Sequence, residues 1–171
     1  MSFMGPRILV GIDKGGIIRR AKKHRTRDPC GAGRPPACHP GRITSPENRM
    51  NKPFDIVVHG ATGFTGRLVV EYLLSRYPNG APLRWAMGGR NADKLAAVRD
   101  ELGAPADTPL VVTDTADPAS LAALMGSARL VLTTVGPYQL YGNELLAACA
   151  ASGTDYVDLC GEPAWMRRMI D

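Results

Sequence analysis

The chain has 171 residues, enough for one domain with a buried core and hardly enough for two. Its net charge of +5 combines two unlike regions. Residues 1–50 carry eleven Lys and Arg against three Asp and Glu, whereas residues 51–171 carry ten against thirteen. The basic character therefore belongs to the first fifty residues, and the body of the chain does not have the charge of a nucleic-acid-binding protein. No apolar run is long enough to span a membrane.

Residues 1–50 are predicted to form a disordered basic extension. The stretch "RRAKKHRTRDPCGAGRPPACHPGR" is rich in Pro, Gly and positive charge and nearly free of large apolar side chains. Such a segment cannot bury enough surface to offset the entropy lost on ordering. A transit peptide and a nucleic-acid-binding tail are alternatives. Met50 directly precedes the regular pattern, so residues 1–49 could also be upstream sequence that is not native coding sequence.

Two cysteines and two histidines in this extension raise the question of a metal site. They are His24, Cys30, Cys38 and His39. The cysteines are spaced too widely for the paired ligands of a zinc knuckle, so we expect no bound metal. Four cysteines in the whole chain without a framework spacing favour a reducing, cytoplasmic compartment.

From Phe54 onward, short apolar runs alternate with segments of helical periodicity. The predicted strands are 54–60, 83–89, 109–114, 128–136 and 154–159. The predicted helices are 64–76, 91–102 with Asn91 as its cap, one that opens at Asp117-Pro118, and 139–152. Five strand–helix alternations with short connections predict a doubly wound parallel α/β sheet of the Rossmann type in residues 54–171.

The first strand-to-helix junction carries a glycine motif. Gly60, Gly63 and Gly66 spell G-x-x-G-x-x-G in "GATGFTG", between a predicted strand and a predicted helix. This context is typical of a dinucleotide-binding turn, in which the glycines allow the tight turn, the approach of the diphosphate and the packing of the helix. The helix N-terminus then faces the phosphates, and Thr62 and Thr65 can add hydroxyl donors.

The end of the second predicted strand indicates which dinucleotide binds. An NAD-selective site usually has an acidic side chain there, to accept a hydrogen bond from the ribose 2′-hydroxyl. This chain has Arg90 instead, with Asn91 beside it and Lys94 one turn on. A guanidinium suits a 2′-phosphate, so the sequence predicts NADP(H).

Two further loops follow predicted strands at the edge where ligands bind in such sheets. Asp114 and Thr115 follow the third strand and could meet the adenine. Gly136-Pro137 forms a rigid turn after the fourth strand, where Tyr138 could flank the nicotinamide. A packed loop with Tyr138 and Tyr141 covering the core is the alternative.

Four motifs in order resemble one family. "GATGFTG", "GGRNADKL", "TTVGPYQLYG" and "GTDYVDLCGE" are similar to the NADP-binding half of saccharopine dehydrogenase-like oxidoreductases, nearest the trans-acting enoyl reductase branch. The resemblance implies an NADPH-dependent reductase of lipid or glycolipid biosynthesis, located in the cytoplasm or at the periphery of the plasma membrane. It carries a cofactor-binding role to these positions: Gly60, Thr62, Gly63, Phe64, Thr65, Gly66, Arg90, Gly136, Pro137 and Tyr138.

The chain departs from the family because it ends before the second, substrate-binding region. An acyl or polyketide-type substrate is therefore expected only if another chain supplies that region, and we assign no catalytic residue. Asp158 and Glu162 lie near the last strand, where a helix cap or a solvated acid is the expected role. A truncated domain would leave a sheet edge that favours a homo-oligomer or pairing with a separate C-terminal half.

Other functions are tested by the residues present. No tyrosine has a lysine four residues later, as a short-chain dehydrogenase requires. Cys149 and Cys160 lack the setting of a semialdehyde dehydrogenase nucleophile. A non-catalytic NADP(H)-binding sensor module and an inactive gene remnant stay open as alternatives.

Overall fold

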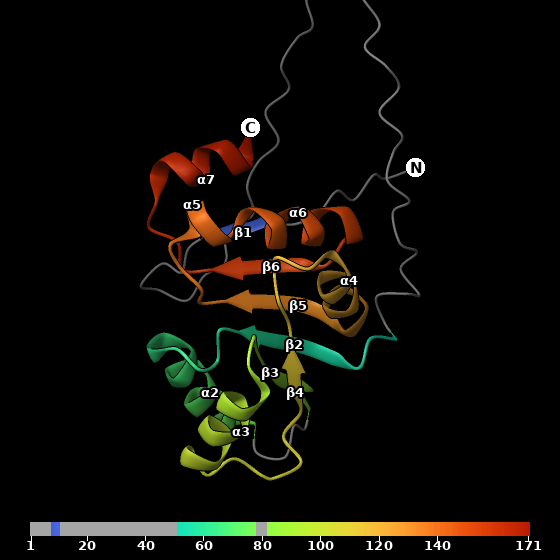
Figure 1. Cartoon of the computed structure of the whole chain (residues 1–171), viewed down its shortest axis with the longest axis vertical. Helices are drawn as coiled ribbons and strands as arrows, with labels where there is room; N and C mark the ends of the chain where they lie inside the picture. The colour runs from blue at the N-terminus through green and yellow to red at the C-terminus, as the bar shows by residue number, and fades with distance from the viewer. Residues whose placement is uncertain (1–7, 11–50, 78–81) are drawn as a thin grey trace, which may run out of the picture.

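Short apolar runs form a parallel sheet, and the segments between them form helices that pack on it (Figure 1). The computed structural model describes residues 8–10, 51–77 and 82–171. Its strands are β1 (Ile8–Val10), β2 (Phe54–His59), β3 (Trp85–Gly89), β4 (Leu110–Val112), β5 (Ala128–Thr133) and β6 (Asp155–Asp158). Its helices are α2 (Phe64–Arg76), α3 (Ala92–Glu101), α4 (Pro118–Ser127), α5 (Tyr138–Tyr141), α6 (Asn143–Ser152) and α7 (Pro163–Ile170).

The strand order places a topological switch in the middle of the sheet. The described strands follow the order β1-β6-β5-β2-β3-β4, and every pair is parallel. The chain runs from β2 outward to β4 and then crosses back to β5 on the other side of β2. A crevice forms between β2 and β5 at the carboxyl ends of such strands, because the loops there diverge in opposite directions. The predicted doubly wound fold is confirmed.

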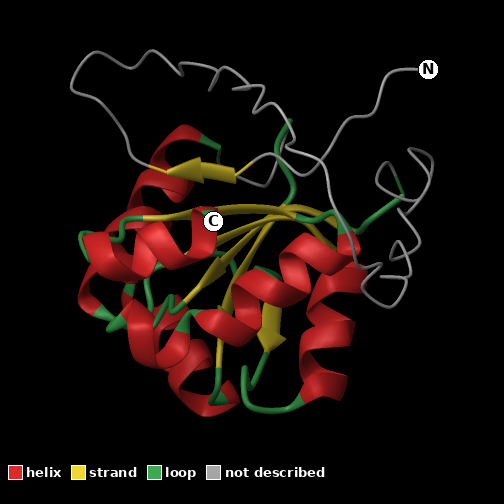
Figure 2. Cartoon of the chain, turned by 90° about the horizontal axis from the view of Figure 1, so that it is seen from above, coloured by secondary structure: helices red, strands yellow, loops and turns green. Residues whose placement is uncertain are grey.

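Both faces of the sheet are covered, which explains the continuous apolar strands (Figure 2). On one face, Val58 and Met87 pack with residues of α2 and α3. On the other face, Val57 and Val131 pack with residues of α4, α6 and α7. Successive residues of β2 thus serve opposite layers, as the alternation of side chains along a strand requires.

Side chains cap the N-termini of α3 and α4, the helices that follow β3 and β4. The Asn91 side chain accepts a hydrogen bond from the Lys94 backbone N–H at 2.9 Å. The Asp117 carboxylate accepts from the N–H groups of Ala119 and Ser120 at 3.0 and 3.2 Å, and Pro118 occupies the first turn of α4. Both predicted helix starts are confirmed, because these residues satisfy amide groups that have no partner within the helix.

The predicted helix 139–152 is divided into α5 and α6 at Gly142. The reason is the packing of α7, a helix that the sequence analysis did not predict. A Cβ at Gly142 would lie 2.7 Å from the Trp165 ring, which is 3% exposed, so the indole of α7 occupies the space of a side chain. The Trp165 indole N–H also donates to Asn143 Oδ1 at 2.8 Å. Pro163 at the first turn is the sequence signal for this helix.

The structure differs from the sequence analysis at one edge of the sheet. Residues 1–50 were predicted to be disordered, but Ile8–Val10 forms β1 and pairs with β6 in parallel, Ile8 opposite Tyr156. The edge beside β6 that was expected to be uncovered therefore carries a short strand. The two cysteines and two histidines that raised the question of a metal site lie outside the described residues. Among the residues that are described, no helix is long and apolar enough to cross a membrane.

Candidate dinucleotide-binding site

The glycine motif forms a tight turn between β2 and α2. Gly60 has φ +90°, and its N–H donates to the Gly88 carbonyl oxygen at 2.9 Å. A Cβ there would lie 2.7 Å from Val135 Cγ2. A Cβ on Gly66 would collide with the Gly60 carbonyl oxygen and lie 2.8 Å from Ala61 Cα, so α2 can approach the turn only with glycine at this position. The turn and helix-packing roles expected for these glycines match this geometry.

The N-terminus of α2 lacks the side-chain cap that α3 and α4 possess. Its N-cap is Gly63, no side chain accepts a hydrogen bond from its first turn, and that turn contains no acidic residue. A helix start without a cap leaves backbone N–H groups and the positive end of the helix dipole available to an anion. Gly63 has room in front of it, because the nearest atom to a built Cβ is the Gly60 carbonyl oxygen at 3.4 Å.

A pocket of about 320 Å³ lies at the carboxyl ends of β2, β3, β4 and β5, at the topological switch. Its lining residues are His59, Gly60, Thr62, Gly63, Gly89, Arg90, Thr115, Thr134, Val135, Gly136 and Tyr141. Six of them were predicted from the sequence: Gly60, Thr62, Gly63, Arg90, Thr115 and Gly136. The structure thus brings residues from four separate strand ends around one cavity.

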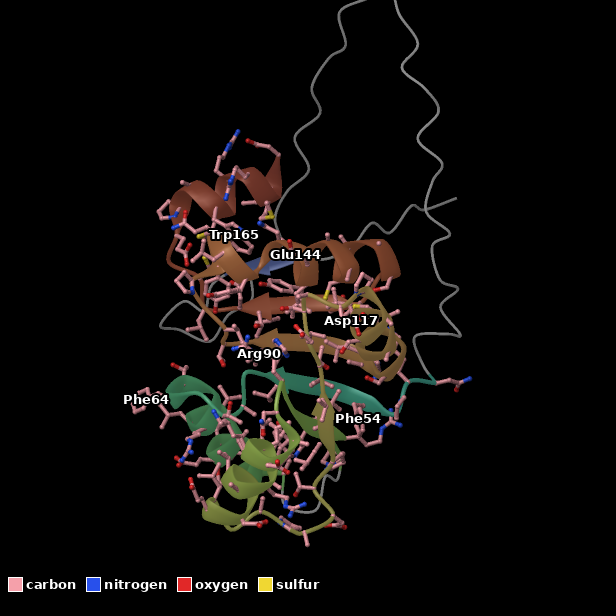
Figure 3. All side chains as sticks on the ribbon, in the orientation of Figure 1. Phe54, Phe64, Arg90, Asp117, Glu144 and Trp165 are labelled. Carbon is pink, nitrogen blue, oxygen red and sulfur yellow. The ribbon has the colours of Figure 1, made fainter. Side chains whose placement is uncertain are left out.

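Arg90 follows β3 directly and its side chain is exposed at the pocket (Figure 3). It forms no ion pair with any described residue. Among the described residues, no acidic side chain lines the pocket, so the guanidinium is the dominant charge there. Its neighbour Asn91 uses its side chain to cap α3, and Lys94 is exposed but does not line the pocket. Of the three predicted phosphate contacts, the structure therefore places Arg90 at the cavity.

In the loop after β4, Asp114 and Thr115 have different roles. The Asp114 carboxylate accepts from the Ala116 N–H at 3.0 Å, and the Asp114 N–H donates to Ser120 Oγ at 2.9 Å. Asp114 thereby shapes the loop, and Thr115 lines the pocket. Only Thr115 of this predicted pair faces the cavity.

The loop after β5 places its two tyrosines differently. Gly136-Pro137 is a cis peptide bond, and Gly136 lines the pocket while Pro137 does not. Tyr138 is 5% exposed, its ring lies 5.6 Å from the Trp165 ring, and its hydroxyl donates to the Thr133 carbonyl oxygen at 3.3 Å. The Tyr138 ring belongs to the core, as the alternative in the sequence analysis held, and Tyr141 supplies the tyrosine at the pocket.

The remaining predicted residues of the glycine turn do not line the pocket. Gly66 is buried against the turn, Thr65 is half-buried in the first turn of α2, and Phe64 is 83% exposed and points away from the sheet (Figure 3). Sequence reasoning missed five lining residues: His59, Gly89, Thr134, Val135 and Tyr141. The first four lie at strand ends next to predicted site residues, which is the signal that could have identified them.

Of the described residues that line the pocket, His59 is the one with a buried ionisable side chain. It is 2% exposed, and its Nδ1 atom has no hydrogen-bond partner among the described residues. Burial, and to a lesser degree the positive charge of Arg90, lowers the pKa of His59 from 6.5 to about 4. The imidazole is therefore neutral at pH 7.

The acids Asp158 and Glu162 and the thiols Cys149 and Cys160 are structural. Glu162 accepts hydrogen bonds from the N–H groups of Tyr138 and Gln139 at 2.6 and 3.0 Å and so caps α5, as the sequence analysis expected. Asp158 is buried and accepts from the Cys160 N–H at 3.1 Å. Burial raises the pKa of Cys149 to about 12 and also raises the pKa of Cys160, so neither thiol has the character of a nucleophile. The described residues contain no cluster of three His, Cys, Asp or Glu that could hold a metal ion.

Comparisons with known proteins agree with this geometry. The chain is 50% identical over 129 residues to a trans-acting enoyl reductase from Mycobacterium leprae, covering 74% of this chain and 29% of that protein. It is also 50% identical over 119 residues to a trans-acting enoyl reductase from Mycobacterium ulcerans, covering 69% of this chain and 28% of that protein. The chain thus spans less than a third of the length of these relatives.

Two solved structures share the fold. Apo saccharopine dehydrogenase (L-Glu forming) from Saccharomyces cerevisiae matches 67% of this chain and 23% of its own, with a TM-score of 0.53 and 15% identity. Triphenylmethane reductase from Citrobacter sp., solved with NADP(H), matches 63% of this chain and 37% of its own, with a TM-score of 0.50 and 24% identity.

The profile of the saccharopine dehydrogenase NADP binding domain matches residues 56–170, which is most of the chain and contains the whole pocket. Such a domain binds NADP(H), and this cofactor is consistent with the end of β3, where Arg90 stands in place of an acidic residue. The chain belongs to the saccharopine dehydrogenase NADP binding domain family, and its cofactor is NADP(H).

Proposed function

We propose that this chain is the NADP(H)-binding part of an oxidoreductase of the trans-acting enoyl reductase type, acting in lipid or glycolipid biosynthesis. The observation that carries the proposal is the pocket at the topological switch, where an uncapped helix start, a glycine turn and an unpaired arginine converge. The 50% identity to mycobacterial proteins of that name supports the finer assignment.

The residues of the pocket have distinct proposed roles. The first turn of α2, with Gly63 and the hydroxyls of Thr62 and Thr65, binds the diphosphate. Arg90 binds the 2′-phosphate, with Lys94 adding positive charge nearby. Thr115 contacts the adenosine side, and Gly136 lies toward the nicotinamide side. NADPH supplies a hydride for an electron-poor carbon, and the chain's own contribution is to bind and orient the dinucleotide.

The domain division is part of the same proposal. Residues 54–171 form the dinucleotide-binding domain, and residues 1–50 are a basic extension that precedes it. The proposed function also includes an acyl or polyketide-type substrate and a location at the membrane periphery. It further includes pairing with a chain that carries the substrate-binding region.

Calorimetry with NADPH and NADH on the 171-residue chain tests the binding assignment. We expect NADPH to bind at least about tenfold more tightly, since a charge-assisted contact to the 2′-phosphate contributes roughly 1.5–3 kcal/mol. A preference for NADH, or equal affinities, would contradict it. Because adding salt screens such a contact, raising the ionic strength should weaken NADPH binding more than NADH binding.

A non-catalytic NADP(H)-binding module is the second candidate function. The observation that favours it is the composition of the pocket, whose ionisable side chains within the described part of the chain are His59, Arg90 and Tyr141. We expect the chain alone to bind NADPH without oxidising it when an enoyl thioester is added, because nothing in the described site positions a substrate. Substrate-dependent NADPH oxidation in stopped flow by the chain alone would rule out the module and show that the catalytic groups are present.

A further inference from the structure

His59 lies in a row of side chains that crosses the sheet at the edge of the pocket. His59 of β2 is the register partner of Gly88 in β3 and of Thr133 in β5. Arg90 follows Gly88 by two residues, so in an extended chain its side chain rises from the same face. Gly88 places no side chain beside His59, and a Cβ there would lie 3.4 Å from His59 Cα. The imidazole and the guanidinium therefore share one face of the sheet with no side chain of β3 between them.

The ring of His59 is buried but incompletely bonded. Its carbonyl oxygen accepts from the Thr134 N–H at 2.9 Å, which fixes the backbone. Its Nδ1 atom has no partner among the described residues, although the residue is 2% exposed and lines the pocket. A buried polar atom normally has a hydrogen-bond partner, so an unpartnered ring in a pocket lining points to a group that the ligand brings. Because Nδ1 itself has almost no accessible surface, the ring must turn for this atom to meet that group.

Among the residues that the structure describes, Arg90 supplies the charge that acts on this ring. Arg90 and Tyr141 are the other ionisable side chains of the pocket lining, and the lining residues from β5 and from the loop after β4 do not titrate. Asp114, beside Thr115, turns its carboxylate to the Ala116 N–H of its own loop. At neutral pH the ring is uncharged, because burial and Arg90 both lower the pKa of His59. A neutral imidazole can lie beside a guanidinium without repulsion and still donate one N–H.

We propose that His59 is a second recognition residue for the 2′-phosphate and donates from Nδ1 to the same phosphate that Arg90 binds. This inference rests on the proposed NADP(H) site. Two consequences follow. The phosphate completes the hydrogen bonding of a buried ring, so loss of His59 weakens ligands that carry a 2′-phosphate and leaves others unchanged. The phosphate also offsets the charge of Arg90 and favours the imidazolium, so binding takes up protons as the pH falls from about 6.5 toward 4.

Proton NMR of the His59 ring in the full chain provides the first test. The chain has three histidines, and the His59→Asn spectrum identifies the resonances of His59 by their absence. We expect the pKa of His59 to start near 4 and to rise by about one unit or more with saturating adenosine 2′,5′-bisphosphate. Adenosine 5′-monophosphate, which lacks the 2′-phosphate, should leave it unchanged.

The outcomes separate this inference from the function on which it rests. If the bisphosphate binds in an Arg90-dependent manner but the His59 pKa does not move, the role of His59 is wrong and the proposed pocket stands. If the bisphosphate does not bind, or binds equally to Arg90→Ala, the proposed pocket itself is wrong. An equal rise with both nucleotides would show that burial of the pocket, rather than the phosphate, acts on the ring.

Affinities of two variants provide the second test. His59→Phe keeps a ring but loses the donor, and we expect about tenfold weaker binding of the bisphosphate and less than twofold change for the monophosphate. His59→Asn keeps a nitrogen donor near the position of Nδ1, so it should stay within about threefold of wild type but lose the proton uptake. Equal losses for both nucleotides would overturn the proposal. If His59→Phe does not fold, the titration of the wild-type ring decides.

Discussion

Strand β2 has a carboxylate, Asp55, near its amino end and an imidazole, His59, at its carboxyl end, and their surroundings are opposite in kind. At the amino end, Asp55 accepts hydrogen bonds from the guanidinium groups of Arg84 and Arg129. Nearby, Lys52 is 7% exposed and donates to the Ala128 carbonyl oxygen and to Thr154 Oγ1, each at 2.9 Å. The polar groups at this end of the sheet have partners within the chain.

At the carboxyl end, polar groups are left open. His59 Nδ1 lacks a partner, the start of α2 has no side-chain cap, and Arg90 has no ion pair within the described residues. The comparison separates stability from binding: changes at the amino end should alter the free energy of unfolding, whereas changes at the carboxyl end should alter nucleotide affinity. Four experiments test this separation.

The largest effect is expected when α2 receives the cap that α4 already has. Gly63→Asp places a carboxylate at the N-cap, where the diphosphate is proposed to bind. Repulsion between close charges at a partly exposed site is worth several kcal/mol, so NADPH affinity should fall by about 100-fold or more. Thermal stability should stay equal or rise slightly, because an Asp cap stabilises a helix start.

A matched variant controls for the added charge. Gly161 lies in open space with no atom within 4 Å of a built Cβ, and it does not line the pocket. Gly161→Asp should change NADPH affinity by less than about twofold, since a charge far from the ligand is screened. A similar loss in both variants would mean that net charge, not the helix start, controls binding.

At the amino end, Lys52→Met should destabilise the fold without affecting the nucleotide. The substitution keeps much of the side-chain volume but leaves the Ala128 carbonyl oxygen and the Thr154 hydroxyl without this donor. The Thr154 hydroxyl keeps its hydrogen bond with Ser152 Oγ, so the cost is that of the two lost hydrogen bonds, about 1–3 kcal/mol, which chemical denaturation would measure. An NADPH affinity that falls in parallel would break the separation between the two ends.

Arg90→Ala should have the converse effect. We expect NADPH to bind about tenfold more weakly, NADH binding to stay unchanged, and the melting temperature to move little, because the side chain is exposed. Calorimetry with both nucleotides on wild type and variant measures this. Equal losses for NADPH and NADH would show that Arg90 supports the fold rather than the 2′-phosphate.

The smallest effect is a pH dependence at the amino end. The hydrogen bonds from Arg84, together with Arg129, lower the pKa of Asp55 from 3.8 to about 2. A carboxylate with a lowered folded-state pKa stabilises the fold above its unfolded pKa and loses that contribution as the pH falls. The stability difference between wild type and Asp55→Asn should therefore be about 1 kcal/mol at pH 6, because solvent screens the half-exposed arginines, and should vanish toward pH 2. A difference that does not change with pH would assign it to packing.

The sequence was informative where one local rule decides the structure. The apolar runs predicted the five strands from β2 to β6, and Asn91 and Pro118 marked their helices, because strand burial and helix capping depend on neighbours in the chain. The glycine turn and Arg90 were found for the same reason. Residues were misplaced where distant segments compete. Tyr138, predicted to flank the nicotinamide, packs instead against Trp165 in the core.

The omissions have a related cause. Tyr141 lines the pocket just before the break at Gly142, a feature that no local pattern shows. His59 directly precedes the predicted Gly60, and that position was its one local signal. Strand β1 pairs with β6 across almost the whole chain, and three apolar residues in a basic stretch give little indication of such a partner. Tertiary contacts between distant segments, rather than propensity, determine these positions.

The chain has two tryptophans, and the fold gives one to each side of the sheet. Trp85 is buried in the layer of α2 and α3, and Trp165 is buried in the layer of α4, α6 and α7. Each layer therefore carries its own intrinsic fluorophore. The variant Trp85→Phe would keep only the Trp165 fluorophore, and Trp165→Phe would keep only Trp85, so each variant reports on one layer. Coincident unfolding curves from the two proteins would show that the layers melt as one cooperative unit.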